Sequence, residues 1–229
     1  MAFVKFMRVS KGTALATLAA FASLWAQPSL AGRPLSVDDA NVNDVGVAHV
    51  ETWLERQADG SRLWTVAPAY GLANGIEIGA SAARDATNQL NTFAVQAKFR
   101  LTPSQQDGCN WGAVIGIAQT RGGANTDPPR INTPYLNGLL TCNLPAGALH
   151  LNLGANRPSG SPTLTTWGIA FERALGAVTA HVEYFGQTRS TPTFQVGART
   201  EIAKNIQIDA TLGRNHTTSV FSLGLKVGF

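Results

Sequence analysis

The sequence predicts an all-β chain, folded as an antiparallel up-and-down transmembrane β-barrel of about twelve strands, and three observations carry this prediction. From residue 45 onward, apolar and polar residues alternate in segments of about ten residues that turn residues separate. Charged residues make up only 14% of the 229-residue chain, compared with about 25% in an ordinary soluble domain. The connections between the segments are alternately long and short, which is typical of barrels in outer membranes.

The first 31 residues are predicted to be a signal peptide that is cleaved on export. Lys5, Arg8 and Lys11 precede an uncharged apolar stretch over residues 13–26, and a small-x-small cleavage site ends at Ala31. This stretch of about 14 residues is shorter than the roughly 20 that a membrane-spanning helix needs, and no later apolar run approaches that length. We therefore expect neither a membrane anchor nor a transmembrane helix in the exported chain.

Residues 32–44 follow the predicted cleavage site as a short polar lead that carries Asp38, Asp39 and Asp44. The sequence leaves two interpretations open for this lead: a periplasmic segment, or a plug that reaches into the mouth of the barrel. Residues 45–229 are predicted to form the barrel itself.

The predicted barrel consists of twelve segments. In order, they cover residues 45–56, 62–70, 76–84, 92–101, 110–120, 133–142, 149–156, 166–173, 178–186, 193–200, 206–214 and 219–229. The fourth alternates most clearly, with Phe93 and Val95 on one face and Gln96 and Lys98 on the other. The second, fifth and sixth alternate poorly, and Pro68 in the second removes a ladder hydrogen bond unless it lies at a bulge.

Three features predict that the apolar faces point outward into lipid, and not inward as in a secreted soluble β-protein. Beyond the signal peptide the chain has only three lysines, Lys98, Lys204 and Lys226, too few to cover the outer face of a soluble barrel. Aromatic residues gather near the segment ends, where rings lie at the two membrane interfaces. The last segment ends in Phe229, in a pattern that resembles the C-terminal signal presented to the barrel-assembly machinery. We therefore expect a protein of the outer membrane of a Gram-negative bacterium, in contact with its lipids and its assembly machinery.

Three stretches of the sequence resemble a known family. They are Gly32-Arg-Pro-Leu-Ser-Val-Asp-Asp-Ala40, the acidic Val50-Glu-Thr-Trp53 of the first segment, and Pro68-Ala-Tyr-Gly-Leu-Ala-Asn-Gly-Ile-Glu-Ile-Gly79. Together they are similar to the outer-membrane proteins grouped with the meta-pathway of phenol degradation, which are often labelled transporters. The resemblance covers most of the chain beyond the signal peptide. It implies a barrel with a transport role, and it carries over no catalytic residue.

The two cysteines, Cys109 and Cys142, are predicted to form a disulfide, which export permits. They lie at the start of the fifth segment and the end of the sixth, which an antiparallel hairpin brings together at the periplasmic rim. The bond would close a loop of about 34 residues and stabilise the hairpin by a few kcal/mol. The alternative, a reactive or metal-binding pair, lacks a neighbouring histidine.

Polar side chains on the face opposite the apolar one are predicted to line the lumen. They are Glu51, Glu77, Lys98, Arg100, His150, Glu172, His181, Glu183, Arg199, Asp209 and Lys226. If the third and fourth segments pair symmetrically about residues 85–92, Glu77 faces Arg100 and the two form an inward ion pair. Two interpretations stay open: the charges stabilise the wall and neutralise each other, or they form a selective constriction.

The sequence predicts no catalytic residue, no metal site and no cofactor. Asn215, His216 and Ser219 are the nearest candidates for a lipid-modifying barrel enzyme, but their spacing matches no barrel lipase or deacylase motif. The four histidines lack metal-ligand spacing, and no glycine-rich phosphate loop follows a strand. Nucleic acid is excluded as a partner because the chain has no dense stripe of lysine and arginine.

Arginines gather at the predicted outer rim. Without the signal peptide, 15 basic residues stand against 14 acidic ones, a net charge of +1, and the long connections hold the basic excess. The rim arginines are Arg62, Arg84, Arg121, Arg130, Arg157, Arg189 and Arg214. Because a guanidinium group binds phosphate as a rigid fork, we expect the rim to contact lipopolysaccharide phosphates or to draw in anionic solutes.

The function that the sequence favours is the passive passage of small-molecule solutes through a narrow lumen, as in a channel or transporter. The solutes are hydrophobic or aromatic if the family resemblance extends to them. One alternative is a non-conducting structural or binding barrel that interacts through its loops. A third possibility is a lipid-modifying barrel enzyme.

Overall fold

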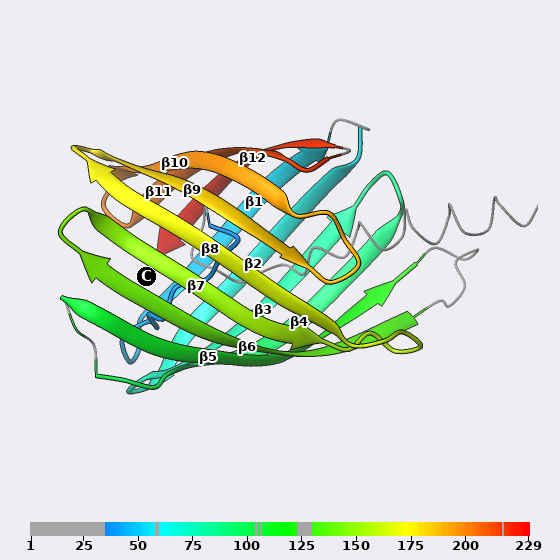
Figure 1. Cartoon of the computed structure of the whole chain (residues 1–229), viewed down its shortest axis with the longest axis horizontal. Helices are drawn as coiled ribbons and strands as arrows, with labels where there is room; N and C mark the ends of the chain where they lie inside the picture. Colours follow the sequence, from blue (N-terminus) through cyan, green and yellow to red (C-terminus); the bar gives the residue numbers. More distant parts are fainter. Residues whose placement is uncertain (1–34, 58–59, 104, 106, 123–129, 217) are drawn as a thin grey trace, which may run out of the picture.

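The chain forms a closed antiparallel barrel in the computed structural model (Figure 1). The structure describes residues 35–57, 60–103, 105, 107–122, 130–216 and 218–229, so the predicted signal peptide lies outside the described residues. The strands are β1 (Ala48–Gln57), β2 (Arg62–Ala73), β3 (Ile76–Asp85), β4 (Leu90–Arg100), β5 (Gly108–Arg121), β6 (Arg130–Leu144), β7 (Gly147–Asn156), β8 (Leu164–Leu175), β9 (Val178–Gln187), β10 (Thr193–Ala203), β11 (Ile206–Arg214) and β12 (Ser219–Gly228). Each strand pairs with its neighbours in sequence and β1 pairs with β12, so the predicted fold is confirmed. Within the described part of the chain, no helix is long and apolar enough to cross a membrane.

The connections differ between the two ends of the barrel, as the sequence predicts. The long-loop end carries the connections 58–61, 86–89, 122–129, 157–163, 188–192 and 215–218. The short-turn end carries the two-residue connections 74–75, 145–146, 176–177 and 204–205, and one longer connection, 101–107. Phe229 also lies at the short-turn end, where its N–H donates a hydrogen bond to the carbonyl oxygen of Ala48 at 2.8 Å. In outer-membrane barrels the short turns face the periplasm.

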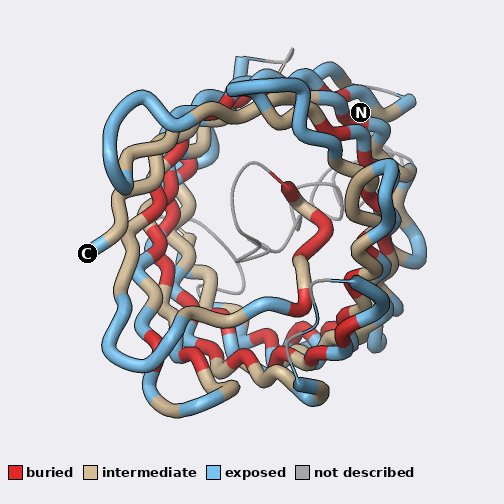
Figure 2. Tube along the Cα trace, turned by 90° about the vertical axis from the view of Figure 1, so that its left-hand side faces the viewer, coloured by how far each residue is buried: buried red, intermediate tan, exposed pale blue. Residues whose placement is uncertain are grey.

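Polar residues face the interior of the barrel and apolar residues face outward. Glu51, His150 and Glu183 face inward and are at most 2% exposed. Leu153 and Leu212 face outward and are 66% and 61% exposed. Buried and exposed positions alternate along the strands (Figure 2). A soluble barrel has the opposite arrangement, so the apolar outer face identifies a barrel built to lie in lipid.

The fifth and sixth segments, which alternate poorly in sequence, form the longest strands, with 14 and 15 residues. Their inward-facing positions include Val114 of β5 and Leu139 of β6, which are 4% and 1% exposed. Both pack with Ala40 of the lead in one apolar cluster. Apolar residues on both faces of these strands hide the period of two, which explains the weak sequence signal.

The pairing of β3 with β4 differs from the prediction, because Glu77 lies opposite Lys98 and not opposite Arg100. Asp85 determines this register: its Oδ1 accepts hydrogen bonds from two backbone N–H groups of the following turn, both at 2.9 Å. The resulting short turn pairs Asp85 with Leu90 and shifts the register by two residues from the symmetric pairing. The predicted Glu77–Arg100 ion pair is therefore wrong.

Pro68 interrupts the ladder between β2 and β3, as expected for a residue without an N–H to donate. It keeps its paired position opposite Val50 of β1. The bulge in the β2–β3 ladder lies further along, between Gly71 and Ala73. The chain therefore accommodates the proline by a local interruption of the ladder and not by a bulge.

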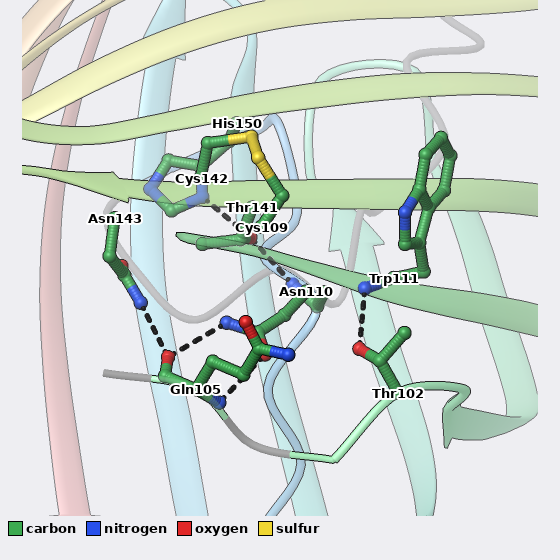
Figure 3. The surroundings of a disulfide bond; sticks show 10 residues. Thr102, Gln105, Cys109, Asn110, Trp111, Thr141, Cys142, Asn143 and His150 are labelled. Carbon is green, nitrogen blue, oxygen red and sulfur yellow. Dashed lines mark hydrogen bonds between the residues drawn. A yellow bond between two sulfur atoms is a disulfide. The ribbon is translucent and has the colours of Figure 1, made fainter. Parts of the chain in front are cut away.

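The predicted disulfide is confirmed. Cys109 and Cys142 lie directly opposite each other in the β5–β6 register and are bonded through their sulfur atoms at the short-turn end (Figure 3). Beside them, the carbonyl oxygen of Gln105 accepts hydrogen bonds from the side-chain amides of Asn110 and Asn143, both at 3.0 Å. The connection between β4 and β5 is thus attached to the hairpin next to the disulfide.

Replacing both Cys109 and Cys142 by serine is expected to lower the free energy of unfolding by about 3 to 4 kcal/mol, because the bond closes a loop of about 34 residues in the unfolded chain. The measurement is the temperature at which heating converts the compact barrel to the slower-migrating unfolded form in gel electrophoresis. Wild-type protein treated with a reductant should behave like the double variant. Equal transition temperatures for the oxidised wild type and the variant would contradict the prediction.

Candidate functional site

The interior of the barrel is a charged surface. Seven of the predicted lumen residues are less than 10% exposed, namely Glu51, Glu77, Lys98, His150, His181, Glu183 and Asp209. The other four, Arg100, Glu172, Arg199 and Lys226, are partly exposed and occupy inward-facing positions in the alternation of their strands. Charges of both signs thus surround the enclosed space.

Ion pairs join neighbouring parts of the wall. Lys226 Nζ lies 3.2 Å from Glu51 Oε1, between β12 and β1. On the other half of the ring, Arg199 Nη1 of β10 lies 2.6 Å from Glu172 Oε2 of β8, and His150 Nε2 of β7 lies 3.6 Å from Glu172 Oε1. Each pair joins strands at most two positions apart, so these contacts stabilise the wall without crossing the lumen.

The lead is a plug over its described part, residues 35–44. Figure 2 shows this segment inside the ring of strands, and the chain then turns into β1 at the short-turn end. Leu35, Val37 and Ala40 are 4%, 1% and 0% exposed, and Asp38 is 3% exposed. Of the two arrangements that the sequence leaves open for the lead, the structure has the one inside the barrel.

Wall side chains hold the backbone at the inner end of the lead. Glu183 Oε2 of β9 accepts hydrogen bonds from the N–H groups of Ser36 and Val37, at 2.7 and 2.9 Å. Asn152 of β7 bonds twice to Asp38: its Oδ1 accepts from the backbone N–H and its Nδ2 donates to the carbonyl oxygen, both at 2.7 Å. The wall thereby satisfies backbone groups that would otherwise be buried without partners.

Two further hydrogen bonds hold the lead nearer the short-turn end. The N–H of Ala40 donates to Thr141 Oγ1 of β6, and the N–H of Asn43 donates to Glu77 Oε2 of β3, both at 2.8 Å. Through its backbone groups, the lead is therefore bonded to four strands, β3, β6, β7 and β9.

Glycines in the wall leave room for the lead. A Cβ atom on Gly168 of β8 would lie 2.6 Å from Val37 Cγ2, and one on Gly112 of β5 would lie 3.2 Å from Ala40 Cα. A larger residue at Gly168 would therefore displace Val37. The sequence prediction missed both glycines; the available signal was a glycine at an inward position of a strand, which often marks close approach of another backbone.

The ammonium group of Lys98 anchors the acidic part of the lead. Its Nζ lies 2.7 Å from Asp38 Oδ1 and 3.6 Å from Asp39 Oδ1, and the side chains of Lys98 and Asp38 are both about 5% exposed or less. Burial raises the pKa of Asp38 to about 7, while the charge of Lys98 acts in the opposite direction. A carboxylate at this depth thus depends on Lys98 for its compensating charge.

A small cavity of about 120 Å³ remains between the lead and the wall, beside Asp39, Glu77 and Lys226. Ligand pockets for small organic molecules usually enclose roughly 300 Å³ or more. With the lead in place, this part of the lumen therefore holds water or a small ion more readily than an organic solute.

The other predicted residues lie at the long-loop end. All seven rim arginines are exposed there, five of them on strands (Arg62, Arg84, Arg121, Arg130 and Arg214) and two in connections (Arg157 and Arg189). His216 and Ser219 are also exposed, and Asn215 Oδ1 accepts a hydrogen bond from the N–H of Thr218 at 2.7 Å, which closes that turn. Among the described residues, no group of histidine, cysteine or acidic side chains could hold a metal ion.

Comparison with solved structures places the barrel among outer-membrane barrels of porin type. It is similar to the KdgM porin with a TM-score of 0.59 and 16% identity, covering 79% of this chain and 99% of that one. It is similar to the NanC porin with a TM-score of 0.55 and 9% identity, covering 78% and 98%. The outer membrane protein Omp33 of Acinetobacter baumannii matches with a TM-score of 0.50 and 9% identity, covering 80% and 97%.

At these identities the likeness establishes the fold. Among curated proteins, none matches the sequence significantly. The family described as uncharacterised conserved protein UCP029691 matches residues 19–224, which include all but the last few residues of the barrel, and the chain belongs to that family.

Proposed function

We propose that the protein is a porin-like channel through which small molecules pass passively, and that the lead is its constriction. The observation that carries this proposal is the way the interior is filled. The wall ion pairs join strands at most two positions apart, whereas the lead, a separate segment, bonds to strands from β3 to β9. Without the lead, polar and charged side chains of the wall would surround an aqueous passage.

The barrel matches nearly the whole length of the KdgM and NanC porins, and this likeness supports a channel. The close hold on the lead favours a second candidate, a non-conducting barrel in which the lead completes a permanent core. The two functions differ in what the intact protein does, because only a channel conducts while the lead is present.

The charge of the interior favours cationic or neutral solutes. The eleven lumen residues include five carboxylates and four lysine or arginine side chains, and the lead adds Asp38 and Asp39, so seven acidic groups face four basic ones. The KdgM porin has a structure in complex with disordered oligogalacturonate, which is a polyanion. An excess of carboxylates opposes such a solute here.

We propose small neutral aromatic molecules as the solute class, on the resemblance to the proteins grouped with the meta-pathway of phenol degradation. Two large aromatic side chains support this: Trp53 and Tyr135 occupy inward-facing positions, and the Tyr135 hydroxyl donates to Gln96 Oε1 at 2.9 Å. Aromatic rings beside polar groups bind flat apolar solutes while a hydrogen bond orients them.

The function is tested with purified protein, with and without the lead, in planar bilayers and proteoliposomes. We expect a reversal potential in a KCl gradient that shows preference for potassium, and faster liposome swelling with a neutral aromatic glycoside than with a sugar acid of similar size. Anion preference would refute the proposed selectivity. No current from the intact protein would refute the channel and leave the non-conducting barrel.

A further inference from the structure

Three arginines form a row on the outside of the barrel at the long-loop end. In the strand register, Arg84 of β3 lies opposite Asn91 of β4, Asn91 lies opposite Arg121 of β5, and Arg121 lies opposite Arg130 of β6. We call these four residues the arginine tier. The arginines are exposed and alternate with inward-facing neighbours. Neighbouring strands lie about 4.8 Å apart, so the tier extends about 14 Å along the rim.

The tier lies above the apolar outer face and is separated from it by one mixed row. Two residues further down each strand, the outward row consists of Ala82, Phe93, Gln119 and Asn132, and the row after it consists of Ala80, Val95, Ile117 and Pro134. Val95 and Ile117 are 57% and 47% exposed. The arginines are therefore at the level where lipid headgroups meet hydrocarbon chains.

Among the described residues, like charges lie side by side in this tier. Arg121 and Arg130 are direct cross-strand partners, and like charges in that position destabilise a sheet. Arg121 Nε donates to Gln119 Oε1 at 2.6 Å and its guanidinium carbon lies 6.0 Å from the centre of the Phe93 ring. These contacts orient Arg121 but add no negative charge.

No carboxylate among the described residues forms an ion pair with the tier. Asp85, which follows Arg84 in sequence, is 7% exposed, and its Oδ1 is bonded to the N–H groups of the following turn. The tier therefore combines excess positive charge, fork-shaped donors and an apolar surface that begins two rows below.

We propose that the arginine tier binds the phosphate groups of lipopolysaccharide in the outer leaflet, with the acyl chains lying along Val95 and Ile117. A guanidinium group donates to phosphate through two parallel N–H bonds, and a phosphate between Arg121 and Arg130 would relieve their repulsion. A row about 14 Å long accommodates more than one phosphate on a single headgroup. This proposal is independent of whether the lumen conducts.

The test is native mass spectrometry of the full-length mature barrel in detergent, titrated with bis-phosphorylated lipid A. An Arg121→Ala/Arg130→Ala variant is expected to bind at least tenfold more weakly than wild type. Lys204→Ala is the control for the loss of one exposed positive charge, because Lys204 lies in the turn between β10 and β11 at the opposite, short-turn end. It is expected to bind as wild type does.

Three further titrations determine what is recognised. Lipid A without phosphates should bind the wild type weakly, with the affinity that bis-phosphorylated lipid A has for the double variant. Inorganic phosphate at the same concentration as the lipid should not displace bis-phosphorylated lipid A from the wild type. Equal affinity of wild type and double variant, loss of affinity in Lys204→Ala, or equal binding of phosphatidylglycerol would each overturn the assignment. Heat-dependent gel mobility establishes that every variant is a folded barrel.

Discussion

Deleting residues 35–42 is expected to raise the single-channel conductance of the reconstituted barrel several-fold. The deletion removes the part of the lead that Glu183, Asn152 and Thr141 hold, and it leaves Asn43 attached to the short-turn end. The wall groups that lose their hydrogen bonds to the lead are polar, and they lie beside the apolar residues that packed against Val37 and Ala40. Water and ions bind to these polar groups and take the place of the lead. The current then reports the wider cross-section, as measured in planar bilayers at fixed salt and voltage.

A matched control keeps the length and the backbone of the lead and removes its side-chain contacts. Residues 35–42 are replaced by a glycine-serine segment of equal length, which has no side chains for the apolar sites around Val37 and Ala40 and loses more conformational freedom on docking. We expect its conductance to lie closer to that of the deletion than to that of wild type. A folded deletion variant with wild-type conductance would show that the lead is not the constriction.

The strands of this barrel are predictable because their two faces lie in different surroundings, lipid on the outside and a polar interior on the inside. Lipid outside and a polar interior place an apolar residue such as Val95 next to a polar one such as Gln96 along most strands, with buried and exposed positions alternating. The disulfide follows from the same pattern, since the two cysteines lie at the joined ends of one hairpin. Both predictions need only the period of two and the order of the strands.

The register of β3 with β4 and the position of the lead depend on contacts that leave no periodic signal. The register depends on one side chain, Asp85, which shortens a turn by bonding to its backbone. The lead is held through its own backbone N–H groups, and any sequence can present those. Its traces in the sequence are indirect: inward apolar residues such as Leu139, and inward glycines such as Gly168.

Replacing Lys98 by methionine is expected to release the lead at pH 8. Removing one member of a buried ion pair costs about 3 to 5 kcal/mol, because Asp38 would stay buried without the ammonium group that now lies 2.7 Å from its carboxylate. A change of about 3 kcal/mol shifts the docking equilibrium more than about 100-fold. The conductance of Lys98→Met should then approach that of the deletion. Arg100→Met is the matched control with wild-type conductance, because Arg100 bonds to Asn74 at 2.9 Å and not to the lead.

Acidification is expected to reverse the effect of Lys98→Met. Burial raises the pKa of Asp38 from its ordinary value of 3.8 to about 7 in the docked state, against the influence of Lys98. The docked state therefore gains a proton before the free lead does, so docking strengthens as the pH falls through this window and weakens as the pH rises through it. Lys98→Met should conduct less at pH 5 than at pH 8, and adding Asp38→Asn should give low conductance at both values. If the conductance of Lys98→Met equals that of wild type at pH 8, or does not change with pH, Lys98 does not hold the lead through Asp38.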